Sequence, residues 1–464
     1  MLEERVGSNS QNSFVLFHRK VWEGWRAWVD KHPALVLLSI LLFALILGVI
    51  KLRIDPPSPE FNWENRWWQI ALNVTRGEGY VSCKPDYFPF CGPGNQVTAM
   101  REPLPVLFFA LVALVTNESL LAAAASIVLI NLATIVAVFY LTRELSNTRT
   151  GLLAAFLWAC YLPPIRLFYS QISGDLFAAL GITCGLLYFL RAQKSNQARE
   201  WVASGLLFGL AILSRSAVLI VAVALTAALF FWLGARARSS PSSGFRWLYP
   251  LILFPSAWAV VMSPWVIRNT IVFDRPVIGS TLSGYYLYRQ QHILPTDNYF
   301  RFVSGGEFLP VLQESVSRHP KLTGLENEAQ MNEIYLEEGI QIIKKYPLRY
   351  LALSAYRFTM LWFNWRVNGV YGKPDTAGDY LMAIQNVFLL VGGMIGLRGR
   401  VWHTWPLLLS VVSFSGLYMA VMAHLPYVIP VVPGLVVLTA IALAQLATLV
   451  SRMFKPSTRA VHVQ

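Results

Sequence analysis

Two carboxylates in the first long polar segment, Glu60 and Glu64, are the first candidates for chemistry in this sequence. If residues 59–64 form a helix, the two side chains share one face, because they lie four residues apart. Carboxylates on one face repel each other unless a cation, a metal ion or a proton joins them, and such crowding can turn one of them into a base. A structural alternative is that an acidic first turn favours the helix N-terminus and that Glu64 pairs with Arg66 or Arg101.

Asp175 is the third acidic candidate, in the segment Ser173-Gly174-Asp175 at the start of an apolar run. A carboxylate at the mouth of a membrane span tends to mark a functional cavity. It can equally be a first-turn residue that suits the helix dipole. The sequence supports both interpretations of Asp175, as a catalytic acid or base and as a helix-terminal residue.

Four more residues are candidates for substrate binding: Arg101, Glu102, Arg215 and Arg268. The planar guanidinium group of arginine matches phosphate and carboxylate groups. A single arginine at the end of a span more often reaches the lipid headgroups. Several arginines beside two or three carboxylates favour a site that combines phosphate binding with a base. Tyr285, in a tyrosine-rich segment, could line a sugar-binding wall, or it could be an interface anchor.

Cysteine and histidine usage predicts no metal site. The seven histidines do not cluster, although two or three carboxylates could still hold Mg²⁺ or Mn²⁺, and no cofactor is expected with certainty. Cys83 and Cys91 are eight residues apart in a polar segment, where they could close a disulfide or remain free thiols. Cys160 and Cys184 lie inside apolar runs and are expected to be packing residues.

The composition indicates the class of protein to which these candidate residues belong. Of 464 residues, 55% are hydrophobic and 14% are charged, which excludes a soluble globular enzyme and a disordered chain. The net charge of +13 fits cytoplasmic loops rather than a nucleic-acid partner, because basic residues gather in the short turns between apolar runs. We therefore expect an all-α, polytopic transmembrane bundle with about ten spans, and with 11–13 as the alternative.

The predicted spans are 34–50, 119–141, 150–165, 173–190, 201–213, 216–234, 248–266, 380–397, 402–422 and 427–450. Residues 103–116 are too short for a crossing and are expected to form an interfacial or re-entrant helix. Residues 350–365 are ambiguous. Residues 319–348, which include Tyr335, Glu337 and Glu338, predict a soluble amphipathic helix. Trp63, Trp67 and Trp68 predict a helix that lies on the outer leaflet.

The basic turns predict the orientation of the bundle. Placing them inside makes residues 1–450 a single domain with both termini in the cytoplasm and a basic tail at 451–464. The outer loops are then 51–118 and 267–349, and the second is expected to select the acceptor. The expected location is the inner cell membrane, with the candidate site facing the periplasm or the exterior.

Five motifs in sequence order resemble those of a known family. They are Glu64-Asn-Arg66 with Ile70-Ala71 and Gly77-Glu-Gly79-Tyr80, then Arg101-Glu102-Pro103-Leu104-Pro105, Ile172-Ser-Gly-Asp175, Pro264-Trp265-Val-Ile-Arg268-Asn269 and Pro426-Tyr427-Val-Ile-Pro430. In this order and spacing the chain resembles the polytopic GT-C glycosyltransferases, in the branch with aminoarabinose transferases and protein O-mannosyltransferases (glycosyltransferase family 39). Two positions differ: Trp63 stands where the family has an Asp, which Glu60 could replace, and Pro426 stands where it has an Arg.

The resemblance implies transfer of a sugar from a polyprenyl-phosphate-linked donor to a lipid, glycan or protein acceptor on the outer face of the membrane. It implies Glu64 and Asp175 as catalytic carboxylates, one of them the base for the acceptor, arginines on the donor phosphate, and Tyr427 as a substrate contact. The alternatives are a transporter or flippase of lipid-linked sugars, which would show charges near the bilayer midplane and an internal repeat, and a scaffold protein. The acidic candidates gather at one predicted outer face, and no matching halves are visible, which favours the enzyme.

Overall fold

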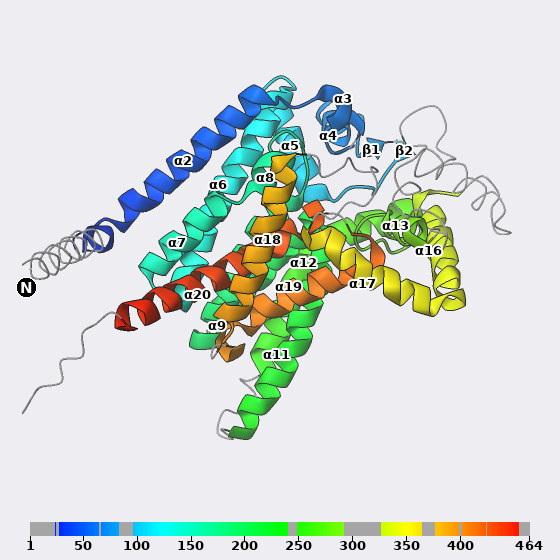
Figure 1. The fold of residues 1–464 in the computed structure, drawn as a ribbon. Helices are drawn as coiled ribbons and strands as arrows, with labels where there is room; N and C mark the ends of the chain where they lie inside the picture. The colour runs from blue at the N-terminus through cyan, green and yellow to red at the C-terminus, as the bar shows by residue number, and fades with distance from the viewer. Residues whose placement is uncertain are drawn as a thin grey trace, which may run out of the picture.

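The protein is a bundle of long apolar helices with smaller elements at one end (Figure 1). The computed structural model describes residues 24, 27–64, 66–82, 96–239, 248–291, 326–363, 376–398, 401–423 and 425–453. Within these ranges, nine helical segments are long and apolar enough to cross a membrane. The all-α polytopic fold is thereby confirmed.

The long helices occur where the sequence predicts spans. They are α2 (Pro33–Ile54), α6 (Leu120–Leu145), α7 (Thr148–Ala159) with α8 (Leu162–Leu167), α9 (Asp175–Ser195), α10 (Ala198–Ser214), η1 (Ser216–Val218) with α11 (Leu219–Ser239), α12 (Tyr249–Phe273), α18 (Ala377–Gly396), α19 (Val401–Val421), and η3 (Leu425–Val431) with α20 (Val432–Met453). Of the ten predicted spans, only α10 falls short of the length criterion, because it has 17 residues.

Burial is uneven among the spans. In α20 the apolar window is 83% buried inside the protein, whereas in α2 it is 17% buried. The central helix α9 packs against α6 and α10, and α10 packs in turn against α12. The start of α9 and the end of α10 are therefore held side by side at one end of the bundle.

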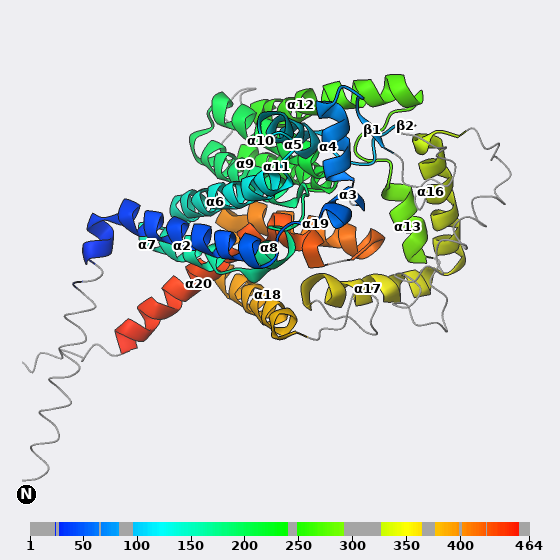
Figure 2. The same cartoon turned by 90° about the horizontal axis from the view of Figure 1, so that it is seen from above.

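The shorter elements lie at that end. They are α3 (Pro59–Glu64), α4 (Trp67–Thr75), α5 (Pro103–Val115), α13 (Ser283–Gln291), α16 (Glu328–Lys345), α17 (Pro347–Phe363) and a two-stranded antiparallel sheet of β1 (Val81–Ser82) and β2 (Gln96–Val97). The 13-residue α5 agrees with the predicted non-spanning helix. Residues 350–363 belong to α17, which is not among the nine spanning segments found in the described ranges and lies at the edge of the bundle in Figure 2.

One predicted placement is wrong. Trp67 and Trp68 were expected on the outer leaflet, but their side chains are only 2% and 5% exposed and pack in the main core. Helix α4 packs against α5, and this neighbour takes the place that lipid was expected to fill. The Trp63 side chain lies outside the described part of the chain.

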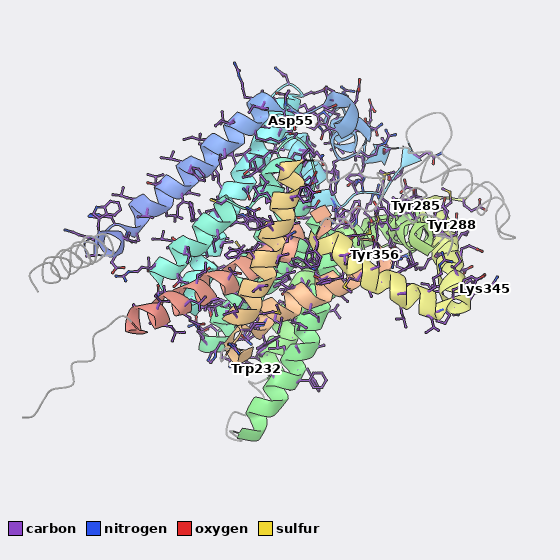
Figure 3. The ribbon with its side chains drawn as sticks, viewed as in Figure 1. Asp55, Trp232, Tyr285, Tyr288, Lys345 and Tyr356 are labelled. Atoms are coloured by element: carbon purple, nitrogen blue, oxygen red, sulfur yellow. The ribbon has the colours of Figure 1, made fainter. Side chains whose placement is uncertain are left out.

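The predicted amphipathic helix near residue 335 is confirmed as α16. Asn327 caps it, since its side chain accepts hydrogen bonds from the backbone N–H groups of Ala329 and Gln330, and the Gln330 side chain completes a capping box. Tyr335 packs on Tyr285 and Tyr288 of α13. Figure 3 labels these two α13 tyrosines. A small second core thus joins α13 to α16.

Candidate active site

The centre of the candidate site is an ion pair between Asp175 and Arg215. Asp175 is the first residue of α9, and Arg215 links the end of α10 to η1. The Arg215 Nε lies 3.3 Å from Asp175 Oδ1, and Nη1 donates to Oδ2 over 3.4 Å. The Asp175 side chain is 4% exposed and that of Arg215 is 14% exposed, so solvent screens the pair little.

Two tyrosines complete the surroundings of the Arg215 guanidinium. Its Nε donates to the Tyr418 hydroxyl over 3.0 Å, and its plane lies 4.6 Å from the ring centre of Tyr427. Tyr418 and Tyr427 stack on each other at 5.0 Å. Burial alone would lower the pKa of Arg215, but the charge of Asp175, with a contribution from the tyrosines, holds that pKa well above its usual value. Arg215 is a fixed cation.

Glycine at 174 is required by the close packing around Asp175. A Cβ atom at this position would overlap the carbonyl oxygen of Ser214 and would lie 3.1 Å from both Pro105 and Trp67. Residues from α4, α5, α9 and α10 therefore meet at one backbone atom. This crowding fixes the start of α9 against the end of α10, which is what brings Asp175 to Arg215.

Glu102 ties a third element to the same place. It is the N-cap residue of α5, and its Oε1 accepts hydrogen bonds from the backbone N–H of Ser216 (2.8 Å) and from its hydroxyl (2.7 Å). Its neighbour Arg101 lies over the Trp67 ring at 5.6 Å, and the Arg101 carbonyl accepts a hydrogen bond from the Tyr80 hydroxyl. Glu102 thus holds the segment that carries Arg215.

A cavity of about 270 Å³ opens beside these residues. Its polar lining comes from Arg101, Glu102, Arg215, Ser216, Ser280, Ser283, Tyr286, Tyr418 and Tyr427. Its apolar lining comes from helices α10, α11 and α19, through Ile212, Leu219, Leu417, Val421 and Met422 among others. Guanidinium and hydroxyl groups beside an apolar wall suit an anionic headgroup that is attached to a lipid.

The first acidic segment lies at the same end of the bundle. Glu60 is exposed on α3, and Glu64 ends this helix with a side chain outside the described part of the chain. Between them, Asn62 is fully buried: its Nδ2 donates to the Ser170 carbonyl over 3.2 Å, and its Oδ1 accepts from the Ile172 N–H at 2.8 Å. Asn62 therefore fastens α3 to the loop that leads to Asp175.

Two predicted substrate residues do not line this cavity. Arg268 donates to the carbonyl of Thr98 and to the side chain of Asn269, both over 2.8 Å, and packs on Trp265. Tyr285 is 3% exposed in the core between α13 and α16, and its neighbour Tyr286 lines the cavity instead. In the structure, Arg268 secures the backbone near β2 and Tyr285 joins two helices.

Cys83 and Cys91 lie outside the described part of the chain, so the structure leaves their predicted disulfide untested. Among the described residues, no group of three or more His, Cys, Asp or Glu side chains could hold a metal ion. Sequence reasoning missed Tyr418 and Ser216, which contact Arg215 and Glu102 respectively. Tyr418 lies inside an apolar run and gave no signal. Ser216 follows Arg215 directly, and that adjacency was its only signal.

Comparison with known proteins supports the fold. The family model of dolichyl-phosphate-mannose-protein mannosyltransferases matches residues 100–267, a range that contains Arg101, Glu102, Asp175 and Arg215. The archaeal oligosaccharyltransferase AglB from Archaeoglobus fulgidus, solved with an inhibitory peptide and a dolichol-phosphate, is 16% identical with a TM-score of 0.52. The chain has a GT-C fold. A second structure of the A. fulgidus enzyme, tethered to an acceptor peptide, gives 16% identity and a TM-score of 0.53.

These GT-C matches cover 92% of this chain but only 52% and 51% of the archaeal enzyme. The chain thus spans about half the length of the proteins that it resembles in structure. No curated protein sequence matches it. The predicted resemblance to GT-C proteins is confirmed as a likeness of fold.

Proposed function

We propose that this protein is a membrane glycosyltransferase that moves a sugar from a polyprenyl-phosphate-linked donor to a lipid, glycan or protein acceptor. The observation that carries the proposal is the buried Asp175–Arg215 pair, whose arginine lines a cavity with cationic, hydroxyl and apolar lining. The family model that matches residues 100–267 describes enzymes that use dolichyl-phosphate-mannose, and AglB was solved with a dolichol-phosphate. Both support a lipid-phosphate donor.

The proposed reaction places developing negative charge next to Arg215. The bond between the anomeric carbon and the phosphate oxygen breaks, and its electron pair stays on the phosphate. A new bond forms between the anomeric carbon and an acceptor oxygen or nitrogen, whose proton passes to a base. The fixed charge of Arg215, with Arg101 on the same cavity, stabilises the departing phosphate.

Two acids have different proposed roles. Asp175 contacts Arg215 and holds the guanidinium in place, and it acts on the reaction through this contact. Glu64, in the segment that Asn62 fastens beside Asp175, is the proposed base for the acceptor, and Glu60 is the second acid of that segment. Tyr427 and Tyr286 line the cavity and are proposed to contact the sugar.

The proposed orientation places this site on the extracytoplasmic face of the inner membrane. The turns α6–α7 and α9–α10, which carry Arg143, Arg149, Arg191 and Arg199, lie at the opposite end of the bundle from α3 and α4 in Figure 1. Short basic turns favour the cytoplasm. The second outer segment, which contains α13 and α16, is proposed to select the acceptor.

The function is tested with the purified protein in liposomes and radiolabelled polyprenyl-phosphate sugars. In the presence of an acceptor mixture, wild type should release polyprenyl phosphate, whereas Asp175→Asn should lower the rate by at least about 100-fold. Asp379→Asn is the matched control, since Asp379 is also a buried first-turn acid paired with an arginine, Arg166 at 3.4 Å, but Arg166 does not line the cavity, whereas Arg215 does. It should retain transfer.

Two outcomes would contradict the proposal. If the sugar–phosphate bond stays intact while the lipid-linked sugar changes leaflet, the protein is a transporter. If Asp175→Asn releases polyprenyl phosphate as fast as wild type does, with equal protein in the liposomes, the Asp175–Arg215 pair is not part of the chemistry.

A further inference from the structure

Glu328 is a buried carboxylate that the proposed chemistry does not use. It is the first residue of α16, is 5% exposed and does not line the cavity. Its Oε1 accepts a hydrogen bond from the Thr98 hydroxyl over 2.7 Å. Its Oε2 accepts two more, from the Ala99 N–H at 3.0 Å and from the Thr281 hydroxyl at 2.9 Å.

Two chain segments that line the cavity, residues 100–102 and residues 278–283, form two of its walls, and the three donors lie within or directly beside these segments. Thr98 and Ala99 directly precede Met100, Arg101 and Glu102, which line one wall. Thr281 lies within the second of these segments, residues 278–283, where four neighbouring residues line the cavity. One carboxylate therefore joins two chain segments that lie far from each other in the sequence.

Further hydrogen bonds pass this restraint on to the backbone. The Thr98 hydroxyl accepts from the Met100 N–H at 3.0 Å, and the Thr281 N–H donates to the Ala99 carbonyl over 3.1 Å. On the other side, Arg268 donates to the Thr98 carbonyl. The backbone just before Arg101 is thus held by α16, by residue 281 and by α12.

Capping of α16 does not account for this arrangement. Asn327 already accepts from the N–H groups of Ala329 and Gln330. Burial raises the pKa of the Glu328 carboxyl, and the hydrogen bonds from Thr98, Ala99 and Thr281 act against that cost. A neutral or apolar side chain would cost less free energy to bury at this position. The carboxylate is therefore explained by the restraint that its hydrogen bonds place on the two walls.

We propose that Glu328 is a positioning residue that fixes the two walls of the cavity to each other and thereby sets the placement of Arg101 and Glu102. It acts through Thr98, Ala99 and Thr281 and does not touch the substrate. This inference rests on the proposed function for its kinetic consequence, but the restraint itself is a property of the protein without substrate.

The first test separates wall position from overall folding without using activity. In a background with the native cysteines replaced by Ser, Met100→Cys is a reporter of the wall, because Met100 lines the cavity yet its side chain is fully buried. Glu328→Gln should raise the maleimide labelling rate of this cysteine at least roughly tenfold in detergent micelles. Glu333→Gln is the matched control on the same helix, because Glu333 is exposed and pairs with Arg275, and it should leave the rate unchanged.

The second test uses the donor and a conservative rescue. Thr281→Val removes the hydroxyl that donates a hydrogen bond to Glu328, whereas Thr281→Ser keeps this hydroxyl. With a radiolabelled polyprenyl-phosphate sugar, Thr281→Val and Glu328→Gln should each raise KM roughly tenfold or more, with a smaller change in kcat. The double variant should be no worse than the poorer single variant, and Thr281→Ser should behave like wild type.

The outcomes keep the two proposals apart. Equal labelling of Met100→Cys in Glu328→Gln and Glu333→Gln, with both proteins folded, would overturn the positioning role even if transfer is observed. Faster labelling in Glu328→Gln, in a protein that never cleaves a lipid-phosphate sugar, would support the wall restraint and defeat the proposed function. A Thr281→Ser variant as impaired as Thr281→Val would also overturn the role of the hydroxyl contact.

Discussion

At the residue scale, substitutions of Arg215 test the proposed mechanism most directly. It combines a carboxylate partner, a tyrosine hydroxyl and a tyrosine face, and each contact uses the planar shape of the guanidinium. A lysine ammonium carries the same charge but has no plane to stack and no fork to share between Asp175 and a phosphate. Replacing Arg215 with lysine therefore separates the contribution of the positive charge from that of the guanidinium shape.

We expect Arg215→Lys to lower single-turnover transfer roughly 10- to 100-fold and Arg215→Ala to lower it further, since preorganised charge is lost in the second variant. The measurement is quench-flow release of polyprenyl phosphate. Arg166→Lys, at the other arginine–aspartate pair, is the control and should stay within about twofold of wild type. Full activity in Arg215→Lys would show that charge alone is needed there.

Several site residues could be predicted from the sequence, and the reason is chemical. Asp175, Arg101, Glu102 and Arg215 are charged groups at the ends of apolar runs, where charge is costly unless it has a use. Four residues that the sequence indicates as candidates, Arg101, Glu102, Arg215 and Tyr427, line the cavity.

Other residues could not be predicted, because their partners are set by tertiary packing. Arg268 resembles a phosphate ligand in sequence, yet it is directed to the carbonyl of Thr98. Tyr418 and Glu328 lie among residues of similar type, so nothing in the local pattern marked them. A contact across more than 200 residues, such as Glu328 with Thr98, leaves no trace in spacing.

At the scale of elements, the convergence of α4, α5, α9 and α10 on Gly174 organises the site. Each of these elements could be predicted to exist from hydropathy, but their approach to within van der Waals contact of one backbone atom could not. Trp67 illustrates the difference: the sequence placed it at the membrane interface, whereas it packs beside Gly174. Span positions follow from the solvent preference of side chains, and close packing follows from shape.

We expect Gly174→Ala to destabilise the protein by about 1–3 kcal/mol, because the added methyl group displaces Ser214 and with it Arg215. Thermal unfolding in detergent measures this. Gly416→Ala, in α19 where a Cβ meets nothing within 4 Å, is the matched control and should gain about 0.5–1 kcal/mol from reduced backbone freedom. An unchanged melting temperature in Gly174→Ala would mean that α9 and α10 are less tightly apposed than described.

At the scale of the whole molecule, the proposed mechanism needs the acidic segment and Asp175 on one side of the membrane. The hydrogen bonds of Asn62 to Ser170 and Ile172 place α3 beside the loop before Asp175. The turn between α9 and α10 lies at the other end of these two helices from Asp175 and Arg215. The molecule as a whole therefore has one face with the site and one face with the basic turns.

Single cysteines at Glu60, Gln171 and Arg199 test this arrangement in a cysteine-free background. A membrane-impermeant maleimide added to intact cells should label Glu60→Cys and Gln171→Cys, and should label Arg199→Cys only after the membrane is opened. Expression is checked with a permeant reagent. Opposite labelling of residues 60 and 171 would remove the basis for a shared site.

The burial of α20 bears on how the protein is made. This helix follows all the other described helices along the chain, yet it has the most buried apolar window, whereas α2, which is inserted early, has the least. During synthesis the earlier spans enter the bilayer before the helix that fills their shared interior exists. Until α20 enters the bilayer, the helix surfaces that pack against it have no protein partner, so insertion of α20 is the step that covers them.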